Sequence, residues 1–228
     1  MNFFAVLQEH THSEREHLIA APIIQGCLRG EVSLPSYIAF LTQAYYHVRH
    51  TVPLLQACKT SLADPKFSHL HWLLPALDEY IEEEYGHDEW ILDDLRACGA
   101  DAEAIRTGSP AFSTEVMVAY AYDLIQRVHP LGFFGMVHVL EGTSVALALM
   151  AADRIQQGLN LPTQAFSYLR SHGTLDQEHT AHFAQLVNAL DRSEEQALLI
   201  HAAKNFYRLY AQVFIDLPLP QGQWKEAA

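Results

Sequence analysis

The chain has 228 residues, of which 50% are hydrophobic and 18% charged, so it can bury a sizeable core and is not expected to be disordered. Its formal net charge is −13, with 14 Lys+Arg against 27 Asp+Glu and no basic cluster, which argues against nucleic-acid binding. Its three isolated cysteines argue against a disulfide framework, and the lack of a signal peptide or of about 18 consecutive uncharged apolar residues predicts a cytoplasmic protein that crosses no membrane.

Nearly every segment has the residue pattern of a helix. Ser33 ahead of Pro35 is a helix N-cap signal, and the run 193–196 is a capping box. No alternation of polar and apolar residues is long enough for a strand. We therefore expect one all-α domain over 1–228, a bundle of seven to eight helices. In chain order the expected helices are 2–28, 33–62 with a kink at Pro53, 66–97, a short helix after Asp101, 113–127, 133–157, 162–190 and 194–215, followed by an extended tail at 216–228.

The penultimate expected helix carries a cluster of metal-ligand residue types. His172, Asp176 and His179 stand at i, i+4 and i+7, so all three project from one helix face. Imidazole and carboxylate together suit iron, manganese or zinc. The alternative is a solvated polar face without a ligand.

Two other segments supply matching partners. Glu84 and His87 have the Glu-x-x-His spacing of carboxylate-bridged dimetal sites in helix bundles, and Glu83 could serve in place of Glu84. Glu141 is the only carboxylate in the apolar run 137–150. A buried carboxylate must be protonated, paired or bound to a cation, so Glu141 is a further candidate ligand.

The second expected helix offers a last donor. His47 and His50 are three residues apart and either could complete a site; we include His50 in the predicted set and keep His47 as its alternative. The order of donors along the chain is that of ferritin-like dimetal proteins. We therefore predict bound iron, two Fe²⁺ ions, with another divalent metal as the alternative, and open coordination positions for O2.

The helix pattern, the segment 40–46 (FLTQAYY) and the triad on the penultimate helix resemble the TenA/PqqC group, which has a heme-oxygenase-like fold; the resemblance covers nearly the whole chain. Within that group the chain is most similar to the heme-oxygenase-like diiron oxidases, which include the Chlamydia protein associating with death domains. Their signature is a Glu/His pair, a single mid-chain Glu and His-x3-Asp-x2-His. It matches His87, Glu141, His172, Asp176 and His179. The resemblance leaves the remaining carboxylate as Glu84 or Glu83, with Tyr80 where some members have the acid.

This resemblance implies a metal-dependent oxidase or oxygenase that activates O2 to oxidise a small metabolite, such as an amine, an amino acid or a fatty-acid-like molecule. Related self-modifying members suggest that a tyrosine near the metals donates electrons, and Tyr46 and Tyr120 are the candidates. We also expect a homodimer.

Three alternatives remain open. A TenA-like thiaminase needs a nucleophilic Cys and an Asp, but Gln43 is followed by Ala44 and the run 134–138 has no Cys. Cys27, Cys58 and Cys98 are better interpreted as small core residues. A heme oxygenase, with His10, His12 or His17 as the axial ligand, would leave Glu141 unexplained. The third alternative is a non-enzymatic acidic interaction protein.

Overall fold

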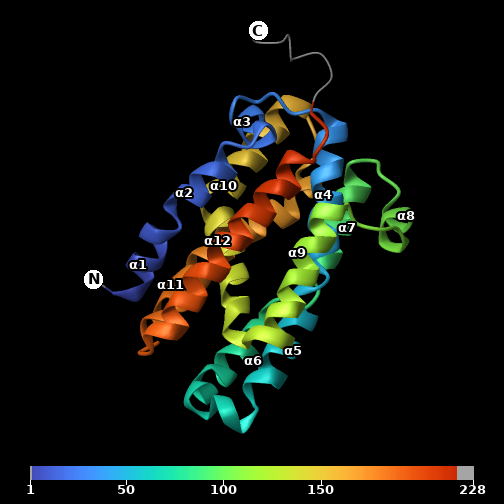
Figure 1. Cartoon of the computed structure of the whole chain (residues 1–228). Helices are drawn as coiled ribbons and strands as arrows, with labels where there is room; N and C mark the ends of the chain where they lie inside the picture. Colours follow the sequence, from blue (N-terminus) through green and yellow to red (C-terminus); the bar gives the residue numbers. More distant parts are fainter. Residues whose placement is uncertain (1, 220–228) are drawn as a thin grey trace.

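Helices and short helical turns make up almost all of the computed structural model, which describes residues 2–219 (Figure 1). No strand occurs in that range. The α-helices are α1 (Phe3–His10), α2 (His12–Ile19), α3 (Pro22–Leu28), α4 (Leu34–Val48), α5 (Thr51–Leu62), α6 (Leu74–Glu83), α7 (His87–Ala97), α8 (Ala102–Thr107), α9 (Phe112–Asp123), α10 (Phe134–Leu159), α11 (Ser167–Asn188) and α12 (Ser193–Ile215). Tighter or wider turns cover Pro65–Leu73, Leu124–Val128, Pro130–Phe133 and Thr163–Phe166.

The all-helical prediction is confirmed, but seven to eight helices is too few, because three of the expected long helices are broken. The expected helix 2–28 is three short helices, and 66–97 is interrupted at Gly86, whose φ of +86° favours glycine. The expected kink at Pro53 is also wrong. The break falls at His50, and Pro53 lies in the first turn of α5, where a missing N–H costs no hydrogen bond. The expected tail lies outside the described residues from 220 onward.

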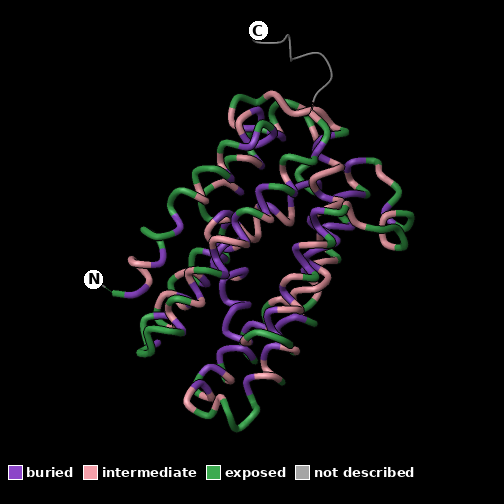
Figure 2. Tube along the Cα trace, in the orientation of Figure 1, coloured by how far each residue is buried: buried purple, intermediate pink, exposed green. Residues whose placement is uncertain are grey.

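Helix α10 lies in the middle of the bundle, in contact with α3, α11 and α12 (Figure 1). Together with the turn before it, Pro130–Leu159 is long and apolar enough to cross a membrane by length and composition. The sequence predicts no segment able to cross a membrane, and by length and composition this helix is an exception. In this fold, however, the helix packs along its neighbours and buries His138 and Glu141. Figure 2 shows the buried residues on the inward faces of the helices.

A buried aspartate fixes the start of α11 to α7. Asp94 is fully buried, and its carboxylate accepts the backbone N–H groups of Ser167 and Tyr168, each at 2.9 Å, as well as the Ser167 hydroxyl. These donors belong to the first turn of α11, whose backbone N–H groups have no helical partner of their own. The contact therefore holds two helices, one carrying His87 and the other His172, in a fixed relation.

Candidate metal centre

The junction between α6 and α7 supplies two ligand-type side chains. Glu84 directly follows α6, Gly86 turns the backbone, and His87 begins α7. The spacing predicted a pair on one helix, but the two residues flank a helix break. Glu84 Oε2 nevertheless lies 3.1 Å from His87 Nδ1. The His87 ring is 3% exposed and stacks on Trp90, with ring centroids 3.9 Å apart.

Helix α11 supplies three more from a single face, as its spacing predicted. Asp176 Oδ1 lies 3.5 Å from His172 Nδ1 and 3.3 Å from His179 Nδ1. Burial opposes ionisation of Asp176, but its two histidine partners outweigh burial and hold the pKa of this carboxyl below its ordinary value. Asp176 is thus a carboxylate that orients both imidazole rings.

The two groups meet in the interior. Glu84, His87 and His172 each place a ligand atom within 4.8 Å of the others, the one such group of three found among the described residues. Glu141 comes in from α10. Burial raises the pKa of Glu141 well above its ordinary value, and the nearby Asp176 and Glu84 raise it further. In the described part of the chain, Glu141 Oε2 and His172 Nε2 are buried without a hydrogen-bond partner.

The structure thus brings together six of the seven expected metal-ligating residues: Glu84, His87, Glu141, His172, Asp176 and His179. The alternative carboxylate, Glu83, touches the cluster from outside, with its Oε2 3.1 Å from His179 Nε2.

The seventh expected residue, His50, lies elsewhere. Its Nδ1 is 3.2 Å from the Tyr122 hydroxyl on α9, because the helix break at this point directs it away from the cluster. Its alternative, His47, is buried in α4 and lines the same cavity as Glu141 and His172. Burial, with a contribution from nearby His172, lowers the pKa of His47 to about 3, so the ring is neutral. His47 therefore replaces His50 as the early-helix candidate.

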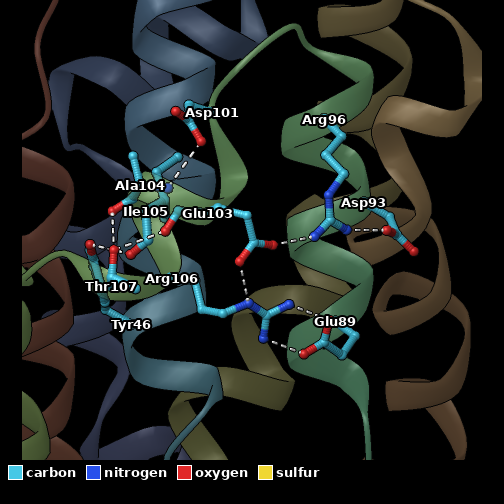
Figure 3. Close-up of polar contacts among 10 residues, drawn as sticks. All are labelled: Tyr46, Glu89, Asp93, Arg96, Asp101, Glu103, Ala104, Ile105, Arg106 and Thr107. Atoms are coloured by element: carbon cyan, nitrogen blue, oxygen red, sulfur yellow. Dashed lines mark hydrogen bonds and ion pairs between the residues drawn. The ribbon is translucent and has the colours of Figure 1, made fainter.

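The two tyrosines expected near the metals, Tyr46 and Tyr120, also lie away from the ligand cluster. Tyr46 turns toward α8 and donates its hydroxyl to the Ile105 carbonyl at 2.7 Å (Figure 3). Tyr120 accepts a hydrogen bond from Asn205 Nδ2 at 2.9 Å. Neither lines the cavity. The structure therefore does not bring either tyrosine to the ligand cluster, because a tyrosine's helix face cannot be assigned to a site before the neighbouring helices are known.

Tyr80 and Tyr168 lie at the site instead. The Tyr168 ring is 4.9 Å from that of His172, and the Tyr80 ring is 5.8 Å from that of His179 (centroid to centroid). Burial and then the neighbouring Glu141 raise the pKa of Tyr80, so its phenol is protonated. Tyr168 stands four residues before His172, and this spacing on the ligand face of α11 would have revealed it in the sequence.

A cavity of about 160 Å³ leads from the apolar interior to this cluster. Glu84, Glu141, His172 and Asp176 line its polar end. The rest of its wall is mostly aliphatic and aromatic side chains of α3, α4, α5, α10 and α12, and among the described residues no Lys or Arg lines it. The site therefore combines concentrated ligand groups with a water-poor approach.

The residues that a thiaminase or a heme oxygenase would need are not suitably placed at this cavity. Cys27 lines it, but burial raises the pKa of that thiol to about 11, so it is not a ready thiolate nucleophile of the kind a thiaminase needs. The candidate axial histidines of a heme oxygenase, His10, His12 and His17, are exposed on α1 and α2 and do not line the cavity.

The arrangement of these helices is the heme-oxygenase-like fold. A domain of unknown function with that fold from Shewanella denitrificans is 20% identical, with a TM-score of 0.82 over 95% of this chain and 92% of that one. A TenA homologue from Pseudomonas syringae is 12% identical, with a TM-score of 0.78 over 94% and 91%. A CADD-like protein of unknown function from Nostoc punctiforme is 16% identical, with a TM-score of 0.71 over 93% and 97%. At these identities the likeness concerns the fold.

The family follows from the sequence. Residues 38–211 match the family described as iron-containing redox enzymes, and the chain belongs to that family. The matched range contains all six clustered ligand residues. A search of the curated proteins finds no match.

Proposed function

We propose that this protein is a non-heme iron oxidase or oxygenase that uses O2 to oxidise a small, largely apolar metabolite. The observation that carries the proposal is the buried cluster of three carboxylates and three histidines at the end of the apolar cavity. Membership of an iron-containing redox enzyme family supports it.

The donor set fits iron. Among the described residues, no Arg or Lys lines the cavity wall beside the acids Glu84, Glu141 and Asp176, and an uncompensated buried carboxylate is costly. Divalent cations would offset this charge, and mixed imidazole and carboxylate ligands suit non-heme iron. Glu84, His87 and His172 would hold one ion. Glu141, Asp176 and His179 would hold a second.

Two Fe²⁺ ions in this site would give two electrons to O2, the oxidised C–H or C–N bond of the substrate would give the other two, and an external reductant would restore Fe²⁺ for the next turnover. The protein's own residues perform the positioning. Asp176 orients His172 and His179, and the apolar wall excludes water and holds the body of the substrate. Because the described residues of that wall away from the ligand cluster are mostly apolar, the substrate is expected to have one polar end, which faces the ligand cluster.

The test is anaerobic titration of metal-free protein with Fe(II), measurement of iron per chain, and then exposure to O2 with absorption recorded. We expect about two irons per chain, as in carboxylate-bridged helix bundles, and new absorption that depends on O2. His172→Ala and Glu141→Ala should each lower the iron content. His10→Ala is the matched control, since His10 is exposed and remote from the cavity. Unchanged iron in both site variants, or no oxygen-dependent absorption, would contradict the proposal.

A further inference from the structure

A second cavity, of about 260 Å³, lies between α6 and α11 on the outer side of the ligand cluster. We call it the vestibule. Its wall consists of Glu79, Tyr80, Glu83, His87, Leu175, Glu178, His179 and His182.

The vestibule shares its inner wall with the metal centre. His87 and His179 belong to the ligand cluster and also line the vestibule, and Tyr80 lines both cavities. All three residues are buried. On the vestibule side, His179 Nε2 lies 3.1 Å from Glu83 Oε2, so a ring of the ligand cluster directly contacts a carboxylate of the vestibule wall. The inner wall of the vestibule therefore consists of residues of the ligand cluster itself, with no further layer of residues between the two.

The charge of the vestibule differs from that of the apolar cavity. Glu79 and Glu83 have side chains 66% and 54% exposed, Glu178 is exposed beside them, and no described Lys or Arg lines the wall. Their nearest basic partners are histidines: His182 Nε2 lies 3.9 Å from Glu79 Oε2. The vestibule is thus an acidic opening whose wall also carries the imidazoles of His87, His179 and His182.

We propose that the vestibule is the route by which a divalent metal ion reaches the buried centre, with Glu79, Glu178 and His182 as its outer capture point. This inference rests on the proposed function. A hydrated dication cannot cross an apolar passage without losing its water shell, which excludes the other cavity as its route. A cleft lined by one sign of charge concentrates the opposite ion and speeds its association.

The vestibule captures the ion in transit and does not store it. Within the described residues, the compact three-ligand group is the internal one, Glu84 with His87 and His172, and no comparable triple occurs in the vestibule. An ion held loosely at the rim would move inward to His179 and then to the buried carboxylates, where its ligands are closer together. The two cavities thus have different roles: the apolar cavity admits the substrate, and the vestibule admits the metal ion.

The experiment compares rates and extents of metal uptake. Metal-free wild-type protein and the Glu79→Gln/Glu178→Gln variant are mixed anaerobically with Fe(II) in a stopped-flow instrument, and final iron per chain is measured. We expect the variant to load roughly three- to tenfold more slowly, and with a weaker dependence on ionic strength, because steering is lost. Its final iron content should equal that of wild type.

Glu9→Gln/Glu115→Gln is the matched control, since it removes the same charge from exposed positions that line neither cavity. It should load at the wild-type rate. Equal rates for the vestibule and control variants would overturn the route while leaving the metal centre intact. A lower final iron content in the vestibule variant would also overturn it, by showing that these glutamates are ligands of the centre. If wild type itself takes up no iron, the proposed function fails, and the route fails with it.

Discussion

Helix α7 borders two polar regions that are built from the same residue types and satisfied in opposite ways. On its outer face, Glu89 accepts two hydrogen bonds from Arg106, at 2.6 and 2.8 Å (Figure 3). About two turns further on, Arg96 bridges Asp93 at 2.6 Å and Glu103 at 2.9 Å. Every carboxylate drawn in this network except the helix-capping Asp101 faces a guanidinium of the same chain.

At its inner end, α7 presents His87 to a cluster whose acids have no such partner. Glu84, Glu141 and Asp176 are largely buried, and no described Arg or Lys lines their cavity. The comparison teaches that an acidic cluster indicates a cation site when the chain fails to supply the cation. The surface network is complete without a ligand, whereas the buried cluster leaves Glu141 Oε2 and His172 Nε2 unpaired.

The largest effect should follow from removing one buried acid. Glu141→Gln is expected to weaken Fe(II) binding at least tenfold, because a charged ligand is lost. The same change should raise the melting temperature of the metal-free protein, because it removes a carboxyl that ionises freely in the unfolded chain but whose ionisation is opposed in the folded protein by burial, Asp176 and Glu84. Anaerobic titration and thermal denaturation measure the two effects. Glu89→Gln on the outer face is the control and should leave iron affinity unchanged; equal affinities in the two variants would break the comparison.

Two adjacent aspartates, Asp93 and Asp94, allow the stability contributions of the outer network and of a buried acid to be compared directly. Asp94→Ala should destabilise the protein by about 2–4 kcal/mol, because three partly buried donors at the start of α11 lose their acceptor. Asp93→Ala removes an exposed acid whose partner is Arg96, so it should cost little. Urea denaturation measures both. Similar losses of stability in the two variants would show that the buried and the exposed aspartate contribute equally to folding, contrary to this prediction.

His138 predicts an acid-sensitive core. Burial lowers its pKa to about 4 from an ordinary value of 6.5. Between these pH values the unfolded chain binds a proton at His138 and the folded protein does not. Stability should therefore fall as pH drops from about 6.5 to about 4, by roughly 3 kcal/mol from this residue. The ring stacks on Phe183, so His138→Phe keeps an aromatic partner there. Denaturation at several pH values should show a shallower loss in that variant; an unchanged pH dependence would contradict the assignment.

The smallest effect is expected at the outer network. Arg106→Ala removes the paired bonds to Glu89, but these groups are solvent-accessible, so salt and water compensate for much of the loss. The melting temperature should fall slightly at low salt and approach that of wild type at high salt. A large loss that salt does not reduce would place this network among the main stabilising contacts.

Local patterns in the sequence were sufficient for the features set within one helix. The face shared by His172, Asp176 and His179 follows from 3.6 residues per turn, and the apolar setting of Glu141 follows from its neighbours. The choice between His47 and His50 did not follow. Both satisfy the same spacing rule, and only the break after α4, with α9 beside it, directs His50 to Tyr122.

The amino-acid sequence by itself thus determined an all-helical chain and the ligand types that it carries, because periodicity, caps and buried charge are local properties. The tertiary structure alone decided which of those side chains share a space. Packing of α6, α7, α10 and α11 joins Glu84 to His172 and opens an acidic vestibule outside them, while the same packing withdraws Tyr46 to Ile105. Contacts between residues far apart in the chain depend on how whole helices meet, and no local pattern encodes that geometry.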